Sequence, residues 1–256
     1  MKFSLCIEPV FTDVDFYDRI QLAKECGADA VELWDPSQYD STRIGKEAAK
    51  NNIPVAAIGF CRSWDCRLND SWPSVRKELE ETILKGKDIG CGTFIGLSGE
   101  VLARVDHQKM ILIENLKRAA DLCEKNNVTI VLEALNSLYD HKGYYLDSSY
   151  VAFEIVRAVN NAYVKVLFDC YHMQIMEGNL VNNIKTNIDF IGHFHSAAVP
   201  GRHEHNKGET DYPFVIHAAE EAGYDRYFGL EYWPTYDNKQ SVLDVLDHVR
   251  RYKNNG

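Results

Sequence analysis

Short apolar runs alternate along the chain with longer stretches in which apolar residues recur every three or four positions. The short runs are rich in β-branched residues and predict buried strands, whereas the longer stretches predict amphipathic helices. The expected strands are residues 2–7, 30–34, 54–60, 93–97, 128–134, 164–168, 189–194 and 227–230. The expected helices are residues 15–26, 41–52, 71–89, 106–126, 148–159, 180–187, 212–222 and 240–252.

Residues with strong conformational preferences mark several helix boundaries. Gly27 and Gly90 follow two expected helices, at the position where a left-handed residue ends a helix. Pro73 falls in the first turn of another helix, and Ser41 is expected to be an N-cap. These signals support the division of the chain into alternating strands and helices.

This alternation repeats eight times, without a linker or a change of composition. Strands separated by helices pair in parallel through right-handed crossovers. Eight such units in 256 residues predict a single (β/α)8 TIM barrel that spans residues 1–256. An open Rossmann-type sheet is disfavoured because no G-x-G-x-x-G follows the first strand, and the glycines of residues 90–96 precede a strand instead.

The net charge, the cysteines and the distribution of apolar residues indicate which partners and which cellular location to expect. The formal net charge is −10, which argues against nucleic acid because such binding depends on Lys and Arg at phosphates. The seven cysteines include no C-x-x-C pair, so reduced and mostly buried thiols are expected. There is no signal-peptide pattern and no apolar run near the ~18 residues of a membrane helix. A cytoplasmic protein that binds neither nucleic acid nor membrane is expected.

Four neighbouring units each end their strand on a side chain that can bind a metal ion. These residues are Glu133, Asp169, His195 and Glu231. The carboxyl ends of barrel strands open onto one face, so these side chains are expected to converge there. Three carboxylates and one imidazole in one pocket need a cation between them. Oxygen-rich ligands with one nitrogen favour one divalent ion, Mn2+ or Mg2+, with Co2+ as a further candidate.

Other polar or aromatic residues near these strand ends are candidates for substrate binding: His172, Arg202, Asn136, Glu204 and Trp64. Arg202 carries a planar, permanent charge that suits a carboxylate or a pair of hydroxyls. The alternative functions are a loop salt bridge for Arg202 and a helix cap for His172. Trp64 is expected in the wall of the pocket.

Glu133 and Glu231, on different strands but on one metal ion, suggest proton transfer as the chemistry. The metal ion would polarise a carbonyl and its neighbouring hydroxyl, which acidifies the C–H between them. One glutamate would remove that proton and the other would handle the proton at the adjacent carbon, through an enediolate. Retaining glycosidases also use two carboxylates, but that alternative leaves the Asp and His unexplained.

At these residues the chain resembles the xylose-isomerase-like superfamily of sugar isomerases and epimerases, and within it hydroxypyruvate isomerases. The segments that carry the resemblance are Phe11-Thr-Asp-Val, Gly27-Ala-Asp-Ala-Val-Glu32, Glu133-Ala-Leu-Asn136, Gly143-Tyr-Tyr-Leu146, Phe168-Asp-Cys-Tyr-His-Met-Gln174, Val199-Pro-Gly-Arg-His-Glu204, Gly208-Glu209 and Leu230-Glu-Tyr-Trp-Pro234. The resemblance implies that Glu133 and Glu231 form the acid/base pair and are also metal ligands, completed by Asp169 and His195. It implies substrate contacts for His172 and Arg202. It also implies a homo-oligomer, because barrels of this family often form dimers or tetramers.

The expected substrate is a small hydroxy-carbonyl compound, either hydroxypyruvate with tartronate semialdehyde or a 2-oxo-tetronate. Hydroxypyruvate isomerases usually have Glu-Pro-x-Asn at residues 133–136 and a Gly/Asp-rich loop at residues 61–67, and this chain departs from both patterns. Its substrate length and stereochemistry therefore stay open, and a ketose 3-epimerase (tagatose or psicose type) would use the same residues. More distant alternatives are an apurinic-type endonuclease and a non-catalytic sugar-binding barrel.

Overall fold

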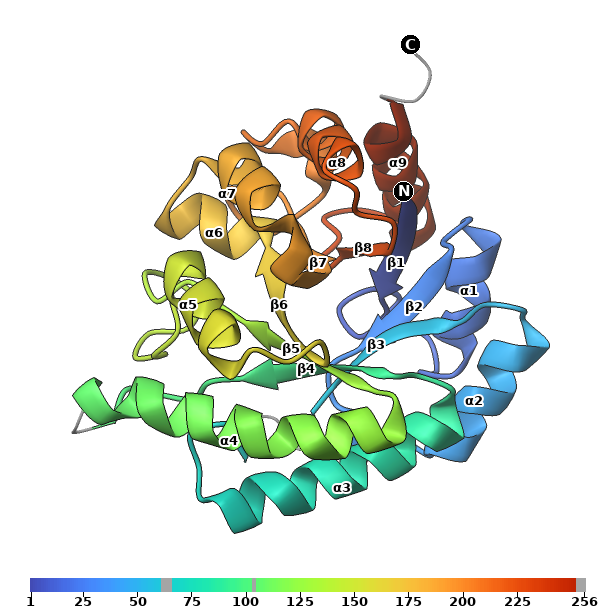
Figure 1. Ribbon diagram of the computed structural model, residues 1–256. Coiled ribbons are helices and arrows are strands. Elements are labelled where there is room, and N and C mark those ends of the chain that lie inside the picture. Colours follow the sequence, from blue (N-terminus) through green and yellow to red (C-terminus); the bar gives the residue numbers. More distant parts are fainter. Residues whose placement is uncertain (61–65, 103–104, 252–256) are drawn as a thin grey trace.

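The computed structural model describes residues 1–60, 66–102 and 105–251 of the chain. In these residues, parallel strands form a closed barrel in the order β1 to β8, and β1 also pairs with β8 (Figure 1). The strands are β1 (Lys2–Cys6), β2 (Ala30–Leu33), β3 (Val55–Gly59), β4 (Thr93–Leu97), β5 (Thr129–Glu133), β6 (Val164–Asp169), β7 (Ile191–His195) and β8 (Tyr227–Leu230). This arrangement confirms the predicted (β/α)8 barrel.

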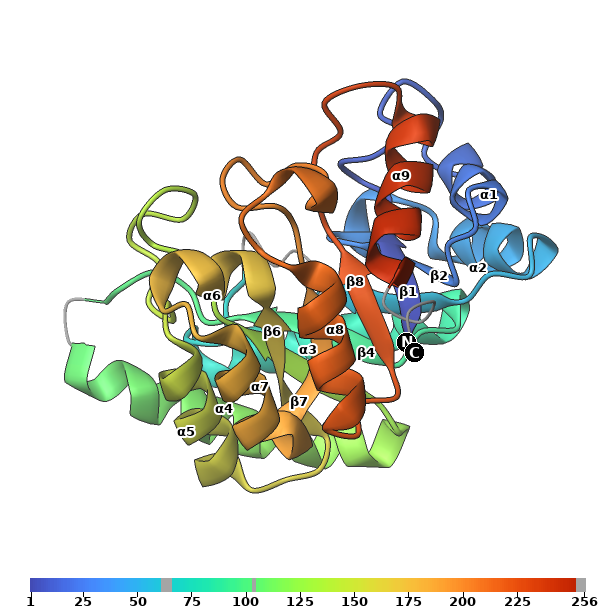
Figure 2. The same ribbon diagram turned by 90° about the horizontal axis from the view of Figure 1, so that it is seen from above.

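Helices surround the barrel, as two perpendicular views show (Figures 1 and 2). They are α1 (Asp18–Glu25), α2 (Ser41–Lys50), α3 (Trp72–Ile89), α4 (Val105–Asn126), α5 (Ser149–Val159), α6 (Cys170–Met176), α7 (Leu180–Asn187), α8 (Tyr212–Glu221) and α9 (Asn238–Arg250). The helix α6 was not predicted. It begins directly after β6 because Asp169, the last strand residue, accepts hydrogen bonds from two backbone amides of the first turn.

Two local predictions are wrong. Ser41 is the first residue of α2 rather than its N-cap, because the carboxylate of Asp40 accepts the backbone amide of Arg43 at 3.0 Å. The Ser41 hydroxyl donates instead to Asp88 at 3.0 Å. Residues 188–190 form a 3-10 helix, so β7 begins later than the predicted residue 189.

The inner face of the barrel has an apolar half and a polar half below the strand ends. A separate apolar cluster consists of Ala57, Ile95, Val131 and Leu167, on β3 to β6. On β7 and β2, the corresponding inner residues are His193 and Glu32, which are 2 % and 1 % exposed. Because strand side chains alternate between faces, each of these residues lies two positions before a residue at the mouth of the barrel. The polar half therefore lies directly beneath the strand ends.

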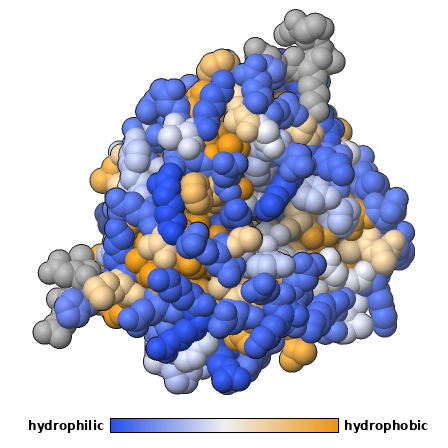
Figure 3. Space-filling view, in the orientation of Figure 1, coloured by the Kyte–Doolittle hydropathy of each residue, from blue (hydrophilic) through white to orange (hydrophobic). Residues whose placement is uncertain are grey.

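One face of the molecule, the thiols and the helices bear on the expectations from composition. The face seen in Figure 3 is mainly hydrophilic, with hydrophobic residues scattered over it. The cysteines that the structure describes are all buried, as the sequence predicts. Within the described ranges, no helix has the length and apolar character that crossing a membrane requires.

The contact between α2 and α3 gives a test of the fold. A Cβ at Gly45 would overlap the carbonyl oxygen of Asp88. Helix propensity alone would make Gly45→Ala stabilising by about 1 kcal/mol. We expect instead a loss of about 1–3 kcal/mol in the free energy of unfolding, measured with urea, because the helices must move apart. Thr42→Ala, at an exposed position of the same helix, should change it by less than about 0.5 kcal/mol. A stabilising Gly45→Ala would contradict the close approach.

Candidate metal centre and active site

The barrel brings the four predicted metal ligands together at the carboxyl ends of its strands. Glu133, Asp169 and His195 are the last residues of β5, β6 and β7, and Glu231 directly follows β8. Each of them offers one ligand atom, and these atoms all lie within 4.8 Å of one another. All four residues are at most 5 % exposed. We refer to these four residues as the metal group.

The metal group contains buried atoms that the protein itself does not satisfy. Oδ1 of Asp169 caps α6, but Oδ2 has no hydrogen-bond partner among the described residues. Nδ1 of His195 also has none, although it lies 3.4 Å from Oε1 of Glu133 and 3.5 Å from Oε2 of Glu231. Buried polar atoms are rarely left without a partner. A divalent cation among these oxygen atoms and this nitrogen atom would satisfy them, so the residues present fit the predicted metal ion.

The charges of the metal group also favour a cation. Burial raises the pKa of Asp169 to about 7, and the charge of Glu231 adds to the rise. Burial likewise raises the pKa of Glu133. Burial alone would lower the pKa of His195, but Glu231 and Glu32 outweigh it and raise that pKa well above its usual value. A cation among these groups would oppose the rise in the pKa of the two carboxylates and favour their charged forms.

Glu231 is held at both of its carboxylate oxygens. The guanidinium of Arg202 donates from Nη2 to Oε2, and the indole of Trp34 donates from Nε1 to Oε1. Burial would raise the pKa of Glu231, but Arg202 and His195 outweigh burial and lower it. Arg202 in turn packs against the rings of Trp233 and Tyr171, 4.8 and 5.3 Å from their centroids. These contacts fix the position of one catalytic candidate.

A cavity of about 180 Å³ opens above the metal group. Its described lining comprises Trp34, Gly59, Ile95, Leu97, Glu133, Leu135, His141, His195, Arg202, Glu231 and Trp233. The polar and charged side chains converge on one part of the cavity, and Ile95, Leu97 and Leu135 give the rest an apolar character. A wider outer cavity of about 650 Å³ adjoins it and shares His141, Arg202 and Trp233. The arrangement suits a small polar substrate bound against an apolar wall.

The candidates for substrate binding do not all reach this cavity. Arg202 lines it, and its buried Nε has no hydrogen-bond partner in the described structure. His172 is 0 % exposed and is not among the described lining residues. Its Nδ1 accepts the backbone amide of Asn136 at 3.1 Å, and its Nε2 lies 3.5 Å from Oδ2 of Asp169. His172 therefore lies behind Asp169, away from the cavity surface.

Asn136 and Glu204 are engaged in local structure. Oδ1 of Asn136 accepts the backbone amides of Tyr139 and Asp140, which holds the loop after β5. The carboxylate of Glu204 is wholly buried and accepts from the hydroxyls of Thr235 and Ser241. Neither Asn136 nor Glu204 lines the described cavity, so the structure gives no contact to support their predicted substrate role. Trp64 lies outside the described residues.

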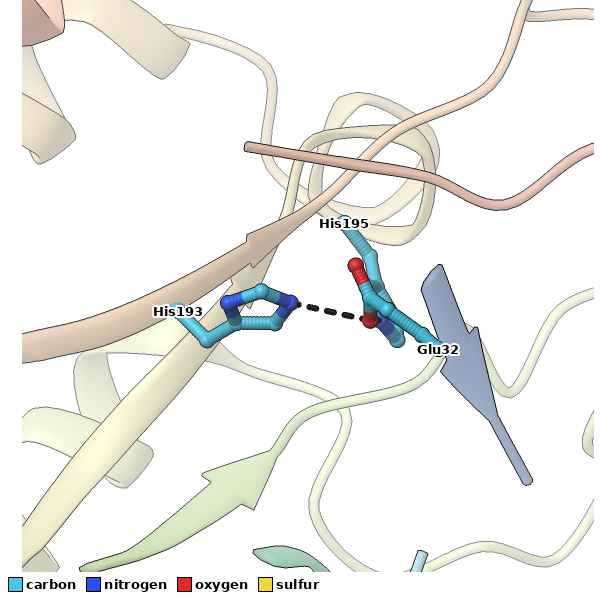
Figure 4. A group of neighbouring side chains, drawn as sticks. All are labelled: Glu32, His193 and His195. Atoms are coloured by element: carbon cyan, nitrogen blue, oxygen red, sulfur yellow. Dashed lines mark hydrogen bonds and ion pairs between the residues drawn. The ribbon is translucent and has the colours of Figure 1, made fainter. Parts of the chain in front are cut away.

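The sequence interpretation gave no role to four residues that surround the metal group: Glu32, His193, Trp34 and His141. Three of these omissions had a signal. Glu32 is a charged residue inside an apolar strand, and Trp34 follows it by two positions, so both point to the inner face. His193 and His195 show the same spacing, and Figure 4 shows both imidazoles beside Glu32. His141 lies in a loop, where periodicity gives no such signal.

Comparison with known proteins agrees with the barrel fold. Residues 20–252 match the family described as "Xylose isomerase-like TIM barrel". The chain belongs to this family. It is 32 % identical to a putative hydroxypyruvate isomerase of Xenopus laevis, over 94 % of each chain. It is 27 % identical to a 2-oxo-tetronate isomerase of Pectobacterium atrosepticum, over 91 % of this chain and 92 % of that protein. Both relatives are isomerases by name, which confirms the enzyme class predicted from the sequence.

Solved structures support the family assignment. The crystal structure of an AP endonuclease, family 2, from Brucella melitensis is 27 % identical, with a TM-score of 0.91 over 96 % of this chain and 98 % of that one. A D-psicose 3-epimerase from Clostridium cellulolyticum shares the fold, with a TM-score of 0.82 over 98 % of this chain and 99 % of that one, but only 18 % identity.

Metal binding by the metal group should stabilise the protein. At free Mn2+ 100-fold above its Kd, the free energy of unfolding should rise by about 2.7 kcal/mol over the EDTA-treated protein. Asp169→Asn should lose most of this gain because it removes a carboxylate that has an unsatisfied oxygen. Glu177→Gln is the control, because that carboxylate accepts only from Ser148 and Ser149 in the described structure. The free energies are measured by urea denaturation. If Mn2+ stabilised Asp169→Asn as much as wild type, the site would be rejected.

Proposed function

We propose that this protein is a divalent-metal-dependent isomerase of a small hydroxy-carbonyl acid. The substrate pair would be hydroxypyruvate with tartronate semialdehyde, or a 2-oxo-tetronate with its isomer. The observation that carries the proposal is the pair Glu133 and Glu231, which flank Nδ1 of His195 and both line one small cavity. The names of the isomerase relatives support the substrate class.

Glu133, Asp169, His195 and Glu231 would hold the metal ion, with Mn2+ or Mg2+ as the first candidates and Co2+ as a further one. When bound, the ion would polarise the substrate carbonyl and the neighbouring hydroxyl, which acidifies the C–H between them. The other groups of the site act on the substrate directly.

The two glutamates carry the proton transfers. One carboxylate removes the proton from the hydroxyl-bearing carbon, and the released electron pair forms the double bond of an enediolate. The other glutamate, protonated, delivers a proton to the former carbonyl carbon. The old hydroxyl oxygen loses its proton and becomes the new carbonyl, while the former carbonyl oxygen gains one. The balance is that of an aldose–ketose isomerisation, without an external oxidant.

Arg202 would position the acid group of the substrate. Its Nη2 already donates to Glu231, but Nε is buried and unpaired within the described residues. Arg202 as a residue lines the cavity, and its fixed positive charge favours an anion such as a substrate carboxylate. The apolar residues Ile95, Leu97 and Leu135 would exclude water from the reacting carbons.

A ketose 3-epimerase is the second candidate. Two bases on one metal ion can also remove a proton from one face of a carbon and return it on the other. The outer cavity of about 650 Å³ supports this candidate, because it offers room for the rest of a longer ketose. The smaller inner cavity of about 180 Å³ favours the shorter substrates.

The substrate class can be tested by a screen of the Mn2+-loaded protein. We expect conversion of hydroxypyruvate or of a 2-oxo-tetronate, because a three- or four-carbon acid fits the inner cavity and places its carboxylate near Arg202. The panel should include C4 to C6 ketoses, with product identified by chromatography. Turnover confined to a hexulose would reject the hydroxy-acid assignment and support the epimerase.

The two-glutamate mechanism predicts the exchange of carbon-bound protons with solvent. Glu133→Gln and Glu231→Gln should each slow deuterium incorporation into bound substrate at least about 100-fold, measured by NMR in D2O, because an amide cannot take up the proton. Glu177→Gln, a carboxylate remote from the cavity lining, should exchange at the wild-type rate. Wild-type exchange in either cavity variant would mean that its glutamate is not an acid/base group.

A further inference from the structure

A fifth acidic residue lies directly beneath the metal group. Glu32, on the inner face of β2, accepts hydrogen bonds at Oε2 from Nε2 of His195 and from Nε2 of His193, both at 2.9 Å (Figure 4). Its other oxygen, Oε1, accepts from the hydroxyl of Ser4. Glu32 is 1 % exposed, so its contacts are with protein groups and not with bulk water.

These contacts decide which nitrogen of His195 faces the metal group. A carboxylate only accepts hydrogen bonds, so Nε2 of His195 must carry a hydrogen. In a neutral imidazole the lone pair is then on Nδ1. Nδ1 is the atom that lies 3.4 Å from Glu133 and 3.5 Å from Glu231, with no hydrogen-bond partner in the part of the chain that the structure describes. Glu32 thereby selects the ring form of His195 that offers a ligand atom to the metal ion.

The packing around Glu32 keeps this arrangement in place. Glu32 lies on β2 and His195 on β7, which are separated in the barrel by β1 and β8. A Cβ at Gly229, on β8, would lie 2.7 Å from Oε1 of Glu32 and 2.7 Å from Cδ2 of His195. A glycine at this position therefore leaves the room in which the carboxylate and the imidazole meet. His193, two residues before His195, supplies the second donor from the same inner face.

We propose that Glu32 is a positioning residue of the metal centre, which orients His195 and directs its Nδ1 to the cation. Removal of a carboxylate that holds a metal-ligating histidine typically lowers metal affinity or activity by about 10- to 100-fold. The inference rests on the proposed metal site and is independent of which substrate the enzyme uses.

The test is the Kd for Mn2+ of the metal-free protein, obtained from the electron paramagnetic resonance of free Mn2+. Glu32→Gln should weaken binding by about 10- to 100-fold relative to wild type. Glu177→Gln is the matched control, since Glu177 also accepts three hydrogen bonds, from Ser148 and Ser149, and the substitution makes the same change of charge. It should bind Mn2+ as wild type does. Urea denaturation of all three metal-free proteins separates lost affinity from lost stability.

The outcomes separate failure of the positioning role of Glu32 from failure of the metal site itself. Wild-type affinity in Glu32→Gln, with or without a loss of stability, would overturn the positioning role and leave the metal site intact. Absence of Mn2+ binding in wild type would reject the site and the inference together.

A measurement on the wild-type chain covers the case in which Glu32→Gln does not fold. In the Mg2+-loaded protein with ¹⁵N-labelled histidine, long-range ¹⁵N–¹H correlation should show His195 protonated at Nε2 and not at Nδ1, with His195→Gln used for assignment. A hydrogen on Nδ1 would overturn the proposal.

Discussion

The structure depends on the compensation of charge at one buried place. Three carboxylates end three strands within 4.8 Å of one another, and the only described imidazole among them is His195. Arg202 provides one permanent positive charge through Glu231, but Oδ2 of Asp169 has no hydrogen-bond partner among the described residues. Burial raises the pKa of Asp169 to about 7, because the charged form loses its contact with water. A divalent cation would resolve this conflict and supply the Lewis acid that the proposed isomerisation needs.

The barrel can hold these buried charges because the two halves of its interior differ. Beneath the site, β3 to β6 contribute apolar side chains that pack against one another. Opposite them, β7 and β2 contribute His193 and Glu32, which hydrogen-bond beneath His195. The polar half fixes the ligands from below, and the apolar half excludes water. Strands β3 to β6 thus supply apolar packing beneath the site, and β7 and β2 supply the polar contacts that support the metal group.

The sequence predicted those parts of the site that can be recognised from one strand at a time. Strands that end on Glu133, Asp169 or His195 can be recognised one at a time, and the closed barrel then brings them together. The same approach could not assign Glu32, because its role depends on a partner across the barrel and on the absence of a side chain at Gly229. It also misplaced the cap of α2, since Asp40 and Ser41 are both good caps and only the contact of Ser41 with Asp88 separates them.

Substrate contacts were the least predictable part of the site. His172 and Asn136 follow the strand ends in sequence, yet they bond to each other beneath the surface of the cavity. Arg202 reaches the cavity from a loop, in a left-handed backbone conformation with φ of 58°. The cytoplasmic location, the homo-oligomer and the absence of nucleic-acid and membrane partners stay predictions from the sequence.

The measurement that tests the central claim most directly is a crystal structure of the Mn2+-loaded protein with anomalous scattering. The account predicts one anomalous peak among the carboxylates of Glu133, Asp169 and Glu231, with Nδ1 of His195 as the nitrogen ligand. A peak at another place, or an empty metal group at saturating Mn2+, would contradict it.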